Sequence, residues 1–332
     1  MALALSALPG PVDVLSVAPS EFFAAADKHG VSGVLWEALR SASPSWGSSL
    51  VQTLEARATA RALDYEAHLA MLRRIDEVLV EHGIDALVLK GPLLARRYYR
   101  QPSARGTSDI DLLVRERDVE RTIEALSVLG FVWRDSDIEQ RYRREHHHLH
   151  LFHPAAPALE LHFHAQSAFG ITLRSEWLIE GGEVAEGFRS LRVPESVDEL
   201  VYLAVHAASH RFGRLSWLYD MKLLVLRLSS SDLSRARERA VAWGYGRVLA
   251  LTAALLVDVL GVPADVVAPL GRLDGVRSPF LRSLVREPEQ PILRAATRFA
   301  YSTMLADSMG ASMKYAASAS SARLRGLFRS ER

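Results

Sequence analysis

The sequence RGTSDIDLLVRE, residues 105–116, places two carboxylates at the mouth of an apolar strand. Asp109 and Asp111 flank Ile110, and three apolar residues follow at once. Side chains two residues apart on a strand point to the same face, with Cα atoms about 6.5 Å apart. Two carboxylates this close repel each other, and each tends to hold a proton unless a cation neutralises the pair. The pattern therefore predicts a bound cation at Asp109 and Asp111.

A third carboxylate follows about fifty residues later, in ALELHFHA (158–165). Apolar and polar residues alternate there, so Glu160 and His162 share one face of a strand. If this strand lies beside the strand of Asp109 and Asp111, Glu160 completes a cluster of three carboxylates. Mg²⁺ prefers such oxygen ligands together with substrate phosphates. A pair of Mg²⁺ ions, or of Mn²⁺ in their place, about 3.5 to 4 Å apart serves phosphoryl or nucleotidyl transfer.

The segments around these residues predict an α+β fold. Short apolar strands and amphipathic helices alternate from residue 83 to residue 170 in the order β-α-β-α-β-β-β, which indicates a small mixed sheet with helices on one face. Helical periodicity precedes and follows this core. We predict an N-terminal helical segment (1–82), an α/β core (83–170) and a C-terminal helical bundle with a basic tail (171–332).

Candidate phosphate ligands lie between the first two strands. Lys90 and Gly91 come directly before Pro92, which opens a helix, and backbone N–H groups at such a turn favour anions. Arg105 and Ser108 stand just before the aspartate pair. Arg105 is expected either to contact phosphate or to pair with an acidic neighbour such as Asp109.

These residues together resemble a known pattern. LKGPLLARRYYRQPSARGTSDIDLLV (89–114) is similar to the core of the DNA polymerase β-type nucleotidyltransferase superfamily, and more narrowly to a bacterial family of uncharacterised nucleotidyltransferases. The likeness covers about residues 20 to 300. It implies metal binding by Asp109 and Asp111, a third ligand or general base at Glu160, and phosphate contacts at Lys90 and Gly91.

The resemblance has two departures. Pro92 stands where the superfamily commonly has a serine that holds the triphosphate, and Glu160 stands where aspartate is usual. The resemblance implies a Mg²⁺-dependent enzyme that moves a nucleoside monophosphate from an NTP donor to an acceptor hydroxyl. The acceptor is open among a small molecule, a protein or peptide, and an RNA 3′ end. The departure at Pro92 leaves a non-catalytic nucleotide-binding protein as the alternative.

Histidines crowd two neighbouring predicted strands, at positions His146, His147, His148, His150, His153, His162 and His164. The first, third and fourth of these share a face, so a zinc site is sterically possible, and a His-rich metal-dependent hydrolase is a second alternative. Contact of His148, His150 or His162 with substrate is the other interpretation.

Three expectations concern the helices after residue 170. Ser196 and Glu199 have the spacing of a capping box. His206 and His210 have the spacing of a zinc-binding pair, but no glutamate follows His206, so the metalloprotease motif is absent. Arg214 is expected to pair with Asp220.

Composition limits the class of protein. The 332 residues carry a formal net charge of +1, which together with the absence of a groove-reading motif makes DNA an unlikely partner. No cysteine is present, so the chain forms no disulfides, as fits the cytoplasm. We predict neither a signal peptide nor a membrane span. The basic tail is expected to be a solvated end that could contact phosphate, and its charged residues are Lys314, Arg323, Arg325, Arg329, Glu331 and Arg332.

Overall fold

The computed structural model describes residues 19–42, 48–134, 140, 143, 146–273 and 291–317. Most of the basic tail, from Arg323 onward, lies outside these residues. The long helices are α1 (Pro19–Lys28), α2 (Ser32–Ala42), α3 (Ser48–Glu81), α4 (Pro92–Tyr98), α5 (Val119–Ser127), α8 (Ser196–Ser209), α9 (Leu215–Val225), α10 (Ser230–Trp243), α11 (Gly246–Leu260) and α14 (Pro291–Leu305). Shorter helical turns are η3 (Pro102–Ala104), η4 (Glu116–Asp118), α7 (Ser175–Ile179), α12 (Ala264–Val267) and η5 (Ala268–Leu270).

The strands of the described chain form two sheets. They are β1 (Ala86–Val88), β2 (Asp109–Leu113), β3 (Val132–Trp133), β4 (His148–Phe152), β5 (Ala158–His162), β6 (His164–Ala168), β7 (Ile171–Arg174), β8 (Glu183–Val184) and β9 (Leu191–Val193). Seven of them form one mixed sheet in the order β3-β4-β5-β2-β1-β9-β8, and β6 pairs with β7. The α+β class and the order β1-α4-β2-α5-β3-β4-β5 are confirmed.

The sheet extends further along the chain than the sequence pattern indicates. Residues after 170 were expected to be helical, but β7, β8 and β9 lie there, and β9 pairs in parallel with β1. These strands have two to four residues, which is too short for a two-residue period to be detected. The helical expectation is therefore wrong for this segment, while the division into three domains stays a prediction.

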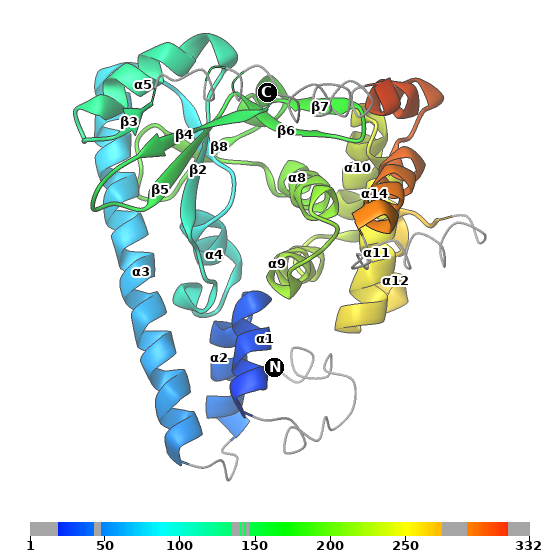
Figure 1. Ribbon diagram of the computed structural model, residues 1–332, viewed down its shortest axis with the longest axis horizontal. Coiled ribbons are helices and arrows are strands. Elements are labelled where there is room, and N and C mark those ends of the chain that lie inside the picture. Colours follow the sequence, from blue (N-terminus) through cyan, green and yellow to red (C-terminus); the bar gives the residue numbers. More distant parts are fainter. Residues whose placement is uncertain are drawn as a thin grey trace.

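Helices cover both faces of the large sheet, not one face as expected. Ile110 and Leu112 of β2 pack with α3 and α5 in one core cluster. Leu113 belongs to a second cluster on the opposite face, together with α4 and the C-terminal helices around α8. Figure 1 shows α3 along one side of the sheet and α8 on the other. Because Asp109 and Asp111 share the face of Leu113, they point toward α8.

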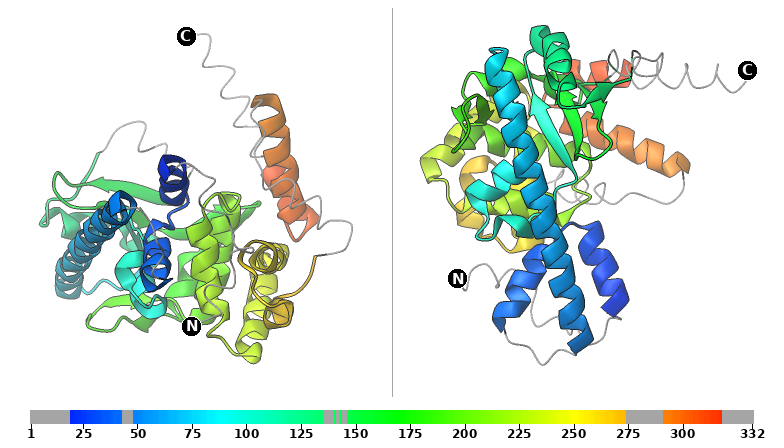
Figure 2. Two further views of the ribbon diagram at one scale, coloured as in Figure 1. Left: turned by 90° about the horizontal axis from the view of Figure 1, so that it is seen from below. Right: turned by 90° about the vertical axis from the view of Figure 1, so that its left-hand side faces the viewer.

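The long helix α3 connects the N-terminal helices to the sheet. Its first half packs beside α2, as Figure 2 shows. Asp76, near its other end, accepts backbone hydrogen bonds from Arg189, Ser190 and Leu191, each 2.8 Å long. Burial alone would raise the pKa of Asp76, but these bonds hold it below its ordinary value. Asp76 therefore fixes the start of β9 beside the sheet.

Ser196 and Glu199, which the sequence pattern assigned to a capping box, instead fix helix α8 against α4. The expected capping box at its start is wrong, because Glu195 occupies the N-cap position and no side chain caps the helix there. Glu199 instead accepts hydrogen bonds of 2.7 Å from both Arg97 and Tyr98. These bonds set the distance between α8 and the core.

In the described residues, no helix combines the length and the apolar composition that crossing a bilayer requires.

Candidate active site

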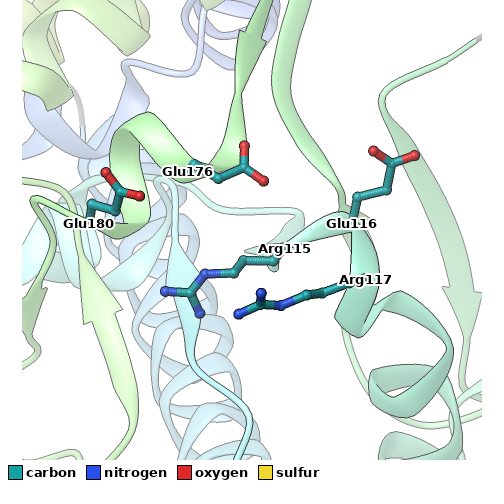
Figure 3. Close-up of a pocket in the computed structure, with 5 residues that line it drawn as sticks. All are labelled: Arg115, Glu116, Arg117, Glu176 and Glu180. Carbon is teal, nitrogen blue, oxygen red and sulfur yellow. The ribbon is translucent and has the colours of Figure 1, made fainter.

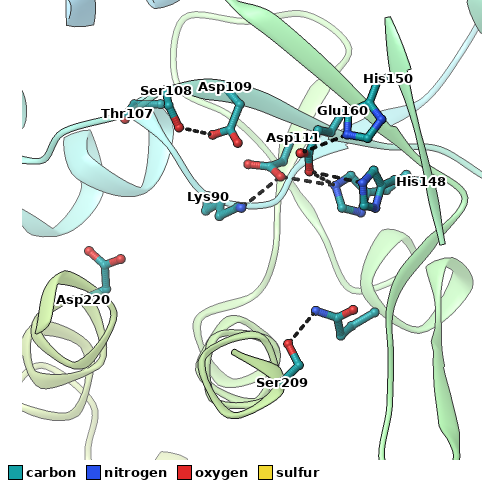
Figure 4. Close-up of polar contacts among 12 residues, drawn as sticks. Lys90, Thr107, Ser108, Asp109, Asp111, His148, His150, Glu160, Ser209 and Asp220 are labelled. Carbon is teal, nitrogen blue, oxygen red and sulfur yellow. Dashed lines mark hydrogen bonds and ion pairs between the residues drawn. The ribbon is translucent and has the colours of Figure 1, made fainter. Parts of the chain in front are cut away.

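The three carboxylates lie together on two neighbouring parallel strands. β2 pairs with β5 so that Asp111 stands opposite Glu160 and Asp109 opposite Ala158. The condition set by the sequence, that these two strands are adjacent, is thereby confirmed. Asp109, Asp111 and Glu160 share one face of the sheet, as Figure 4 shows. Lys90 and His162 both contact Asp111.

Asp111 is the centre of the cluster, and it is 2% exposed. Lys90 Nζ lies 3.0 Å and His162 Nε2 lies 3.2 Å from its Oδ1 atom. Its Oδ2 atom is buried and has no hydrogen-bond partner in the described structure. Burial alone would raise the pKa of Asp111, but Lys90 and His162 hold it below its ordinary value. Asp111 is therefore an ionised carboxylate with one oxygen unsatisfied.

The pKa of the neighbouring Asp109 is shifted in the opposite direction. Burial raises the pKa of Asp109, and the charge of Asp111 raises it further. Ser108 donates a hydrogen bond of 3.3 Å to Asp109, which opposes this rise only in part. A cation bound between the two carboxylates would remove their repulsion, in line with the sequence prediction.

Glu160 is surrounded by imidazoles. His162 Nε2 and His148 Nε2 lie 3.4 and 3.8 Å from Oε2, and His150 Nε2 lies 3.7 Å from Oε1. Burial would raise the pKa of Glu160, but these imidazoles hold it well below its ordinary value. Burial, together with the charge of His162, lowers the pKa of His148 to about 3. His148 is therefore a neutral imidazole at physiological pH.

Among the described residues, His146, His148 and His150 do not form the three-histidine site that the sequence made sterically possible. His146 is exposed, and the groups that could hold a metal ion among the described residues are His147 with His148 and His162, His148 with His150 and Glu160, and Asp111 with Glu160 and His162. On the later helix, the rings of His206 and His210 lie 5.2 and 5.3 Å from Trp217. Neither of these two belongs to such a group.

Lys90 and Gly91 stand at the turn between β1 and α4. Gly91 has φ 75° and ψ −142°, a conformation that favours glycine, and Pro92 is the first residue of the helix. Burial would lower the pKa of Lys90, but Asp111 and Asp109 raise it above its ordinary value. Lys90 is therefore a charged amine beside the carboxylates, and its contact with phosphate stays a prediction.

Arg105 has a partner that the sequence did not indicate. Its guanidinium forms a buried, two-pronged ion pair with Asp220 of α9, with Nη2 2.9 Å from Oδ2. Both expected ion pairs, Arg105 with Asp109 and Arg214 with Asp220, are therefore wrong. Arg214 instead lies over the ring of Trp217, at 5.8 Å from its centroid. The interactions of Arg105 make it a support for the turn before β2.

Tyr202 of α8 is a residue that sequence analysis missed. It is fully buried, and its hydroxyl has no hydrogen-bond partner in the described structure. Burial, followed by the charges of Asp111, Glu160 and Asp109, raises its pKa well above the ordinary value. The hydroxyl is therefore a neutral donor close to the carboxylates. The sequence carried no signal for this position beyond the helical period of α8.

Among the cavities that the described residues line, two are relevant to the position of the site. One of about 690 Å³ is lined by Arg115, Glu116, Arg117, Glu176 and Glu180 (Figure 3). This cavity lies after the carboxyl end of β2, whereas Asp109 is the first residue of that strand. The cavity is therefore separate from the carboxylate cluster. The other, of about 740 Å³, is lined by Lys28, His29, Ser209, His210, Arg211, Gly213, Arg298, Tyr301, Ser302 and Tyr315. Its lining residues come from the end of α1 and the turn after it, from the end of α8, and from α14 and the residues that follow it.

Comparisons with known proteins assign the chain to a family. No curated protein matches the chain. A family model described as uncharacterised nucleotidyltransferase matches residues 16–261, which include every element from α1 to α11. The match contains the three carboxylates, Lys90 and the helix that carries Tyr202. The chain therefore belongs to this family of uncharacterised nucleotidyltransferases.

Proposed function

We propose that the chain is a Mg²⁺-dependent nucleotidyltransferase of the DNA polymerase β type, which moves a nucleoside monophosphate from an NTP to an acceptor hydroxyl and releases pyrophosphate. The observation that carries this proposal is the parallel pairing of β2 with β5, which gathers Asp109, Asp111 and Glu160 beside Lys90. Family membership supports the general reaction. A cytoplasmic location, where NTPs and Mg²⁺ are available, is part of the proposal.

The residues of the site fit a hard divalent cation. The unsatisfied, buried Oδ2 atom of Asp111 provides a ligand oxygen that the protein itself does not use. Carboxylate oxygens are the ligands that Mg²⁺ prefers, and Mn²⁺ accepts the same donors. Asp109, Asp111 and Glu160 would hold two ions. When bound, such ions neutralise the triphosphate and activate the attacking oxygen.

Side chains of the protein bind the phosphates, accept the proton and orient the base. Lys90 neutralises charge on the β- and γ-phosphates, and the backbone amide of Gly91 donates a hydrogen bond to them. To reach the phosphates, the Lys90 amine leaves its ion pair with Asp111. The acceptor oxygen bonds to the α-phosphorus while the bond to pyrophosphate breaks. Glu160, which lies opposite Asp111 on the neighbouring strand, takes the proton of the acceptor hydroxyl. His148, His150 and His162 orient Glu160.

A direct assay tests this function. The purified protein is incubated with Mg²⁺, each α-³²P-labelled NTP in turn, and separated small-molecule, protein and RNA fractions of a cell extract. We expect label to enter one fraction from one preferred NTP and to stay out when EDTA replaces Mg²⁺. Binding of NTP without transfer to any fraction would favour a non-catalytic nucleotide-binding protein, and release of labelled NMP to water would favour a hydrolase.

We further propose that the acceptor enters through the 740 Å³ cavity at the end of α8. Three basic side chains and no acidic one are found among its described lining residues, and Ser209 in its wall connects to β6 through a 3.1 Å hydrogen bond from Gln166. The cavity therefore lies next to the strand that continues from β5. This position supports access to Glu160 from the side of the C-terminal helices.

Filling this cavity should separate acceptor binding from donor binding. We expect Ser302→Trp to raise the KM for the acceptor at least about tenfold, a loss of about 1.4 kcal/mol, while the KM for the NTP stays within about twofold. Ala296→Trp, at an exposed position of the same helix, serves as the control. Equal KM values for the acceptor in both variants would place the acceptor elsewhere.

A further inference from the structure

The histidine-rich strands form a second constellation beside the proposed Mg²⁺ site. β4 and β5 pair in antiparallel register, with His148 opposite His162 and His150 opposite Glu160. All four side chains therefore project from the same face of two hydrogen-bonded strands. Figure 4 shows His148 and His150 on the far side of Glu160 from Lys90. The cluster stands on rigid strands and not on loops.

The distances within this cluster are longer than those of ordinary hydrogen bonds. The Nε2 atoms of His148 and His150 lie 3.8 and 3.7 Å from the carboxylate oxygens of Glu160. Hydrogen bonds between nitrogen and oxygen are about 2.7 to 3.2 Å long. Ligand atoms bound at about 2.0 to 2.1 Å to a tetrahedral ion lie about 3.4 Å apart. Small side-chain movements would bring the three groups onto one ion.

We infer that His148, His150 and Glu160 form a binding site for a transition-metal dication of the zinc type. Two imidazoles and one carboxylate, with further positions open, are a ligand set that Zn²⁺ uses in catalytic sites. Imidazole suits zinc and its neighbours in the first transition row, whereas Mg²⁺ prefers oxygen ligands alone. The ligand atoms all lie within 4.8 Å of one another.

This site is chemically distinct from the carboxylate pair of Asp109 and Asp111. Glu160 offers one oxygen toward His150 and the other toward His148 and His162, so it can join the two sites. His162, 3.2 Å from Asp111 and 3.4 Å from Glu160, stands at their border. The inference concerns metal binding itself and stands whether or not the chain transfers nucleotides.

Cobalt provides a spectroscopic probe of the site. The metal-free full chain is titrated with Co²⁺ in the presence of millimolar Mg²⁺, and then with Zn²⁺. We expect a visible ligand-field absorption that saturates at one Co²⁺ per chain and is abolished by one equivalent of Zn²⁺. No saturable absorption, or its loss on adding Mg²⁺ alone, would overturn the assignment.

Variants assign the signal to its ligands. His148→Ala and His150→Ala should each weaken Zn²⁺ binding at least about 100-fold, because losing even an outer-shell partner costs 10- to 100-fold. His153→Ala, at the end of the same strand and hydrogen-bonded to Leu129 instead, should bind Zn²⁺ as the wild type does. Unchanged affinity in both ligand variants would overturn the site. Because His150 is 37% exposed, its truncation leaves folding intact, which circular dichroism verifies.

One more variant separates this inference from the proposed function. Asp109→Asn should abolish nucleotidyl transfer and leave the Co²⁺ spectrum unchanged. Loss of the spectrum in this variant would mean that the ion occupies the carboxylate pair, and the inference of a separate site would be wrong. A wild-type chain that binds zinc at these histidines but transfers no nucleotide would contradict the proposed function alone.

Discussion

Asp111→Asn is expected to lower the rate of nucleotidyl transfer at least about 1,000-fold, a loss of about 4 kcal/mol of transition-state stabilisation. Asparagine keeps the shape of the side chain but removes the charge that would hold a divalent ion. Asp111 is the central carboxylate of the site, since Lys90 and His162 both contact it and its second oxygen has no hydrogen-bond partner among the described residues. The measurement is kcat/KM with the preferred NTP.

Folding must be kept apart from catalysis in this experiment. In the variant, Lys90 loses its partner at 3.0 Å, but the charges of Asp109 and Glu160 still act on it, so the chain should remain folded. Asp118→Asn is a matched control, because Asp118 is also buried and ion-paired, to Arg121, but lies beyond the far end of β2. A variant at Asp111 that keeps more than a tenth of wild-type activity would contradict the mechanism.

The core of the candidate site could be predicted because its pattern is local. A two-residue period fixes which side chains share a face of a strand, so Asp109 with Asp111, and Glu160 with His162, follow from the sequence directly. Only the adjacency of the two strands had to be assumed, and the structure confirms it. Likewise, Pro92 has the fixed φ that suits the first position of a helix, and α4 begins there.

What could not be predicted depends on pairing across long stretches of sequence. Ser196 and Glu199 have the local spacing of a capping box, yet both bind side chains of α4 that lie about a hundred residues earlier. The helical period shows that Tyr202 lies on α8, but it does not show which buried face meets the carboxylates. Strands as short as β8 and β9 acquire their conformation from the sheet they join, and their own residues carry little signal.

The largest stability effect is expected at the ion pair that the sequence assigned to the wrong arginine. Asp220 is fully buried and accepts hydrogen bonds from Arg105 and, at 2.6 Å, from Tyr99. Asp220→Ala leaves the buried guanidinium of Arg105 without its counter-charge. Removing one partner of a buried pair costs about 3 to 5 kcal/mol, and we expect that loss in the free energy of unfolding measured with urea.

Two further variants show whether the loss comes from the unpaired charge. Arg214→Ala should cost less than about 1 kcal/mol, because Arg214 is exposed and stacks on Trp217. Replacing both members of the pair, as in Arg105→Met with Asp220→Leu, should recover much of the stability, because a buried pair can often be exchanged for apolar residues. The activity of the double variant also shows whether the active site needs Arg105, since Arg105 supports the turn before β2. If the double variant is as unstable as Asp220→Ala, packing around the pair, and not the uncompensated charge, holds α9 to the core.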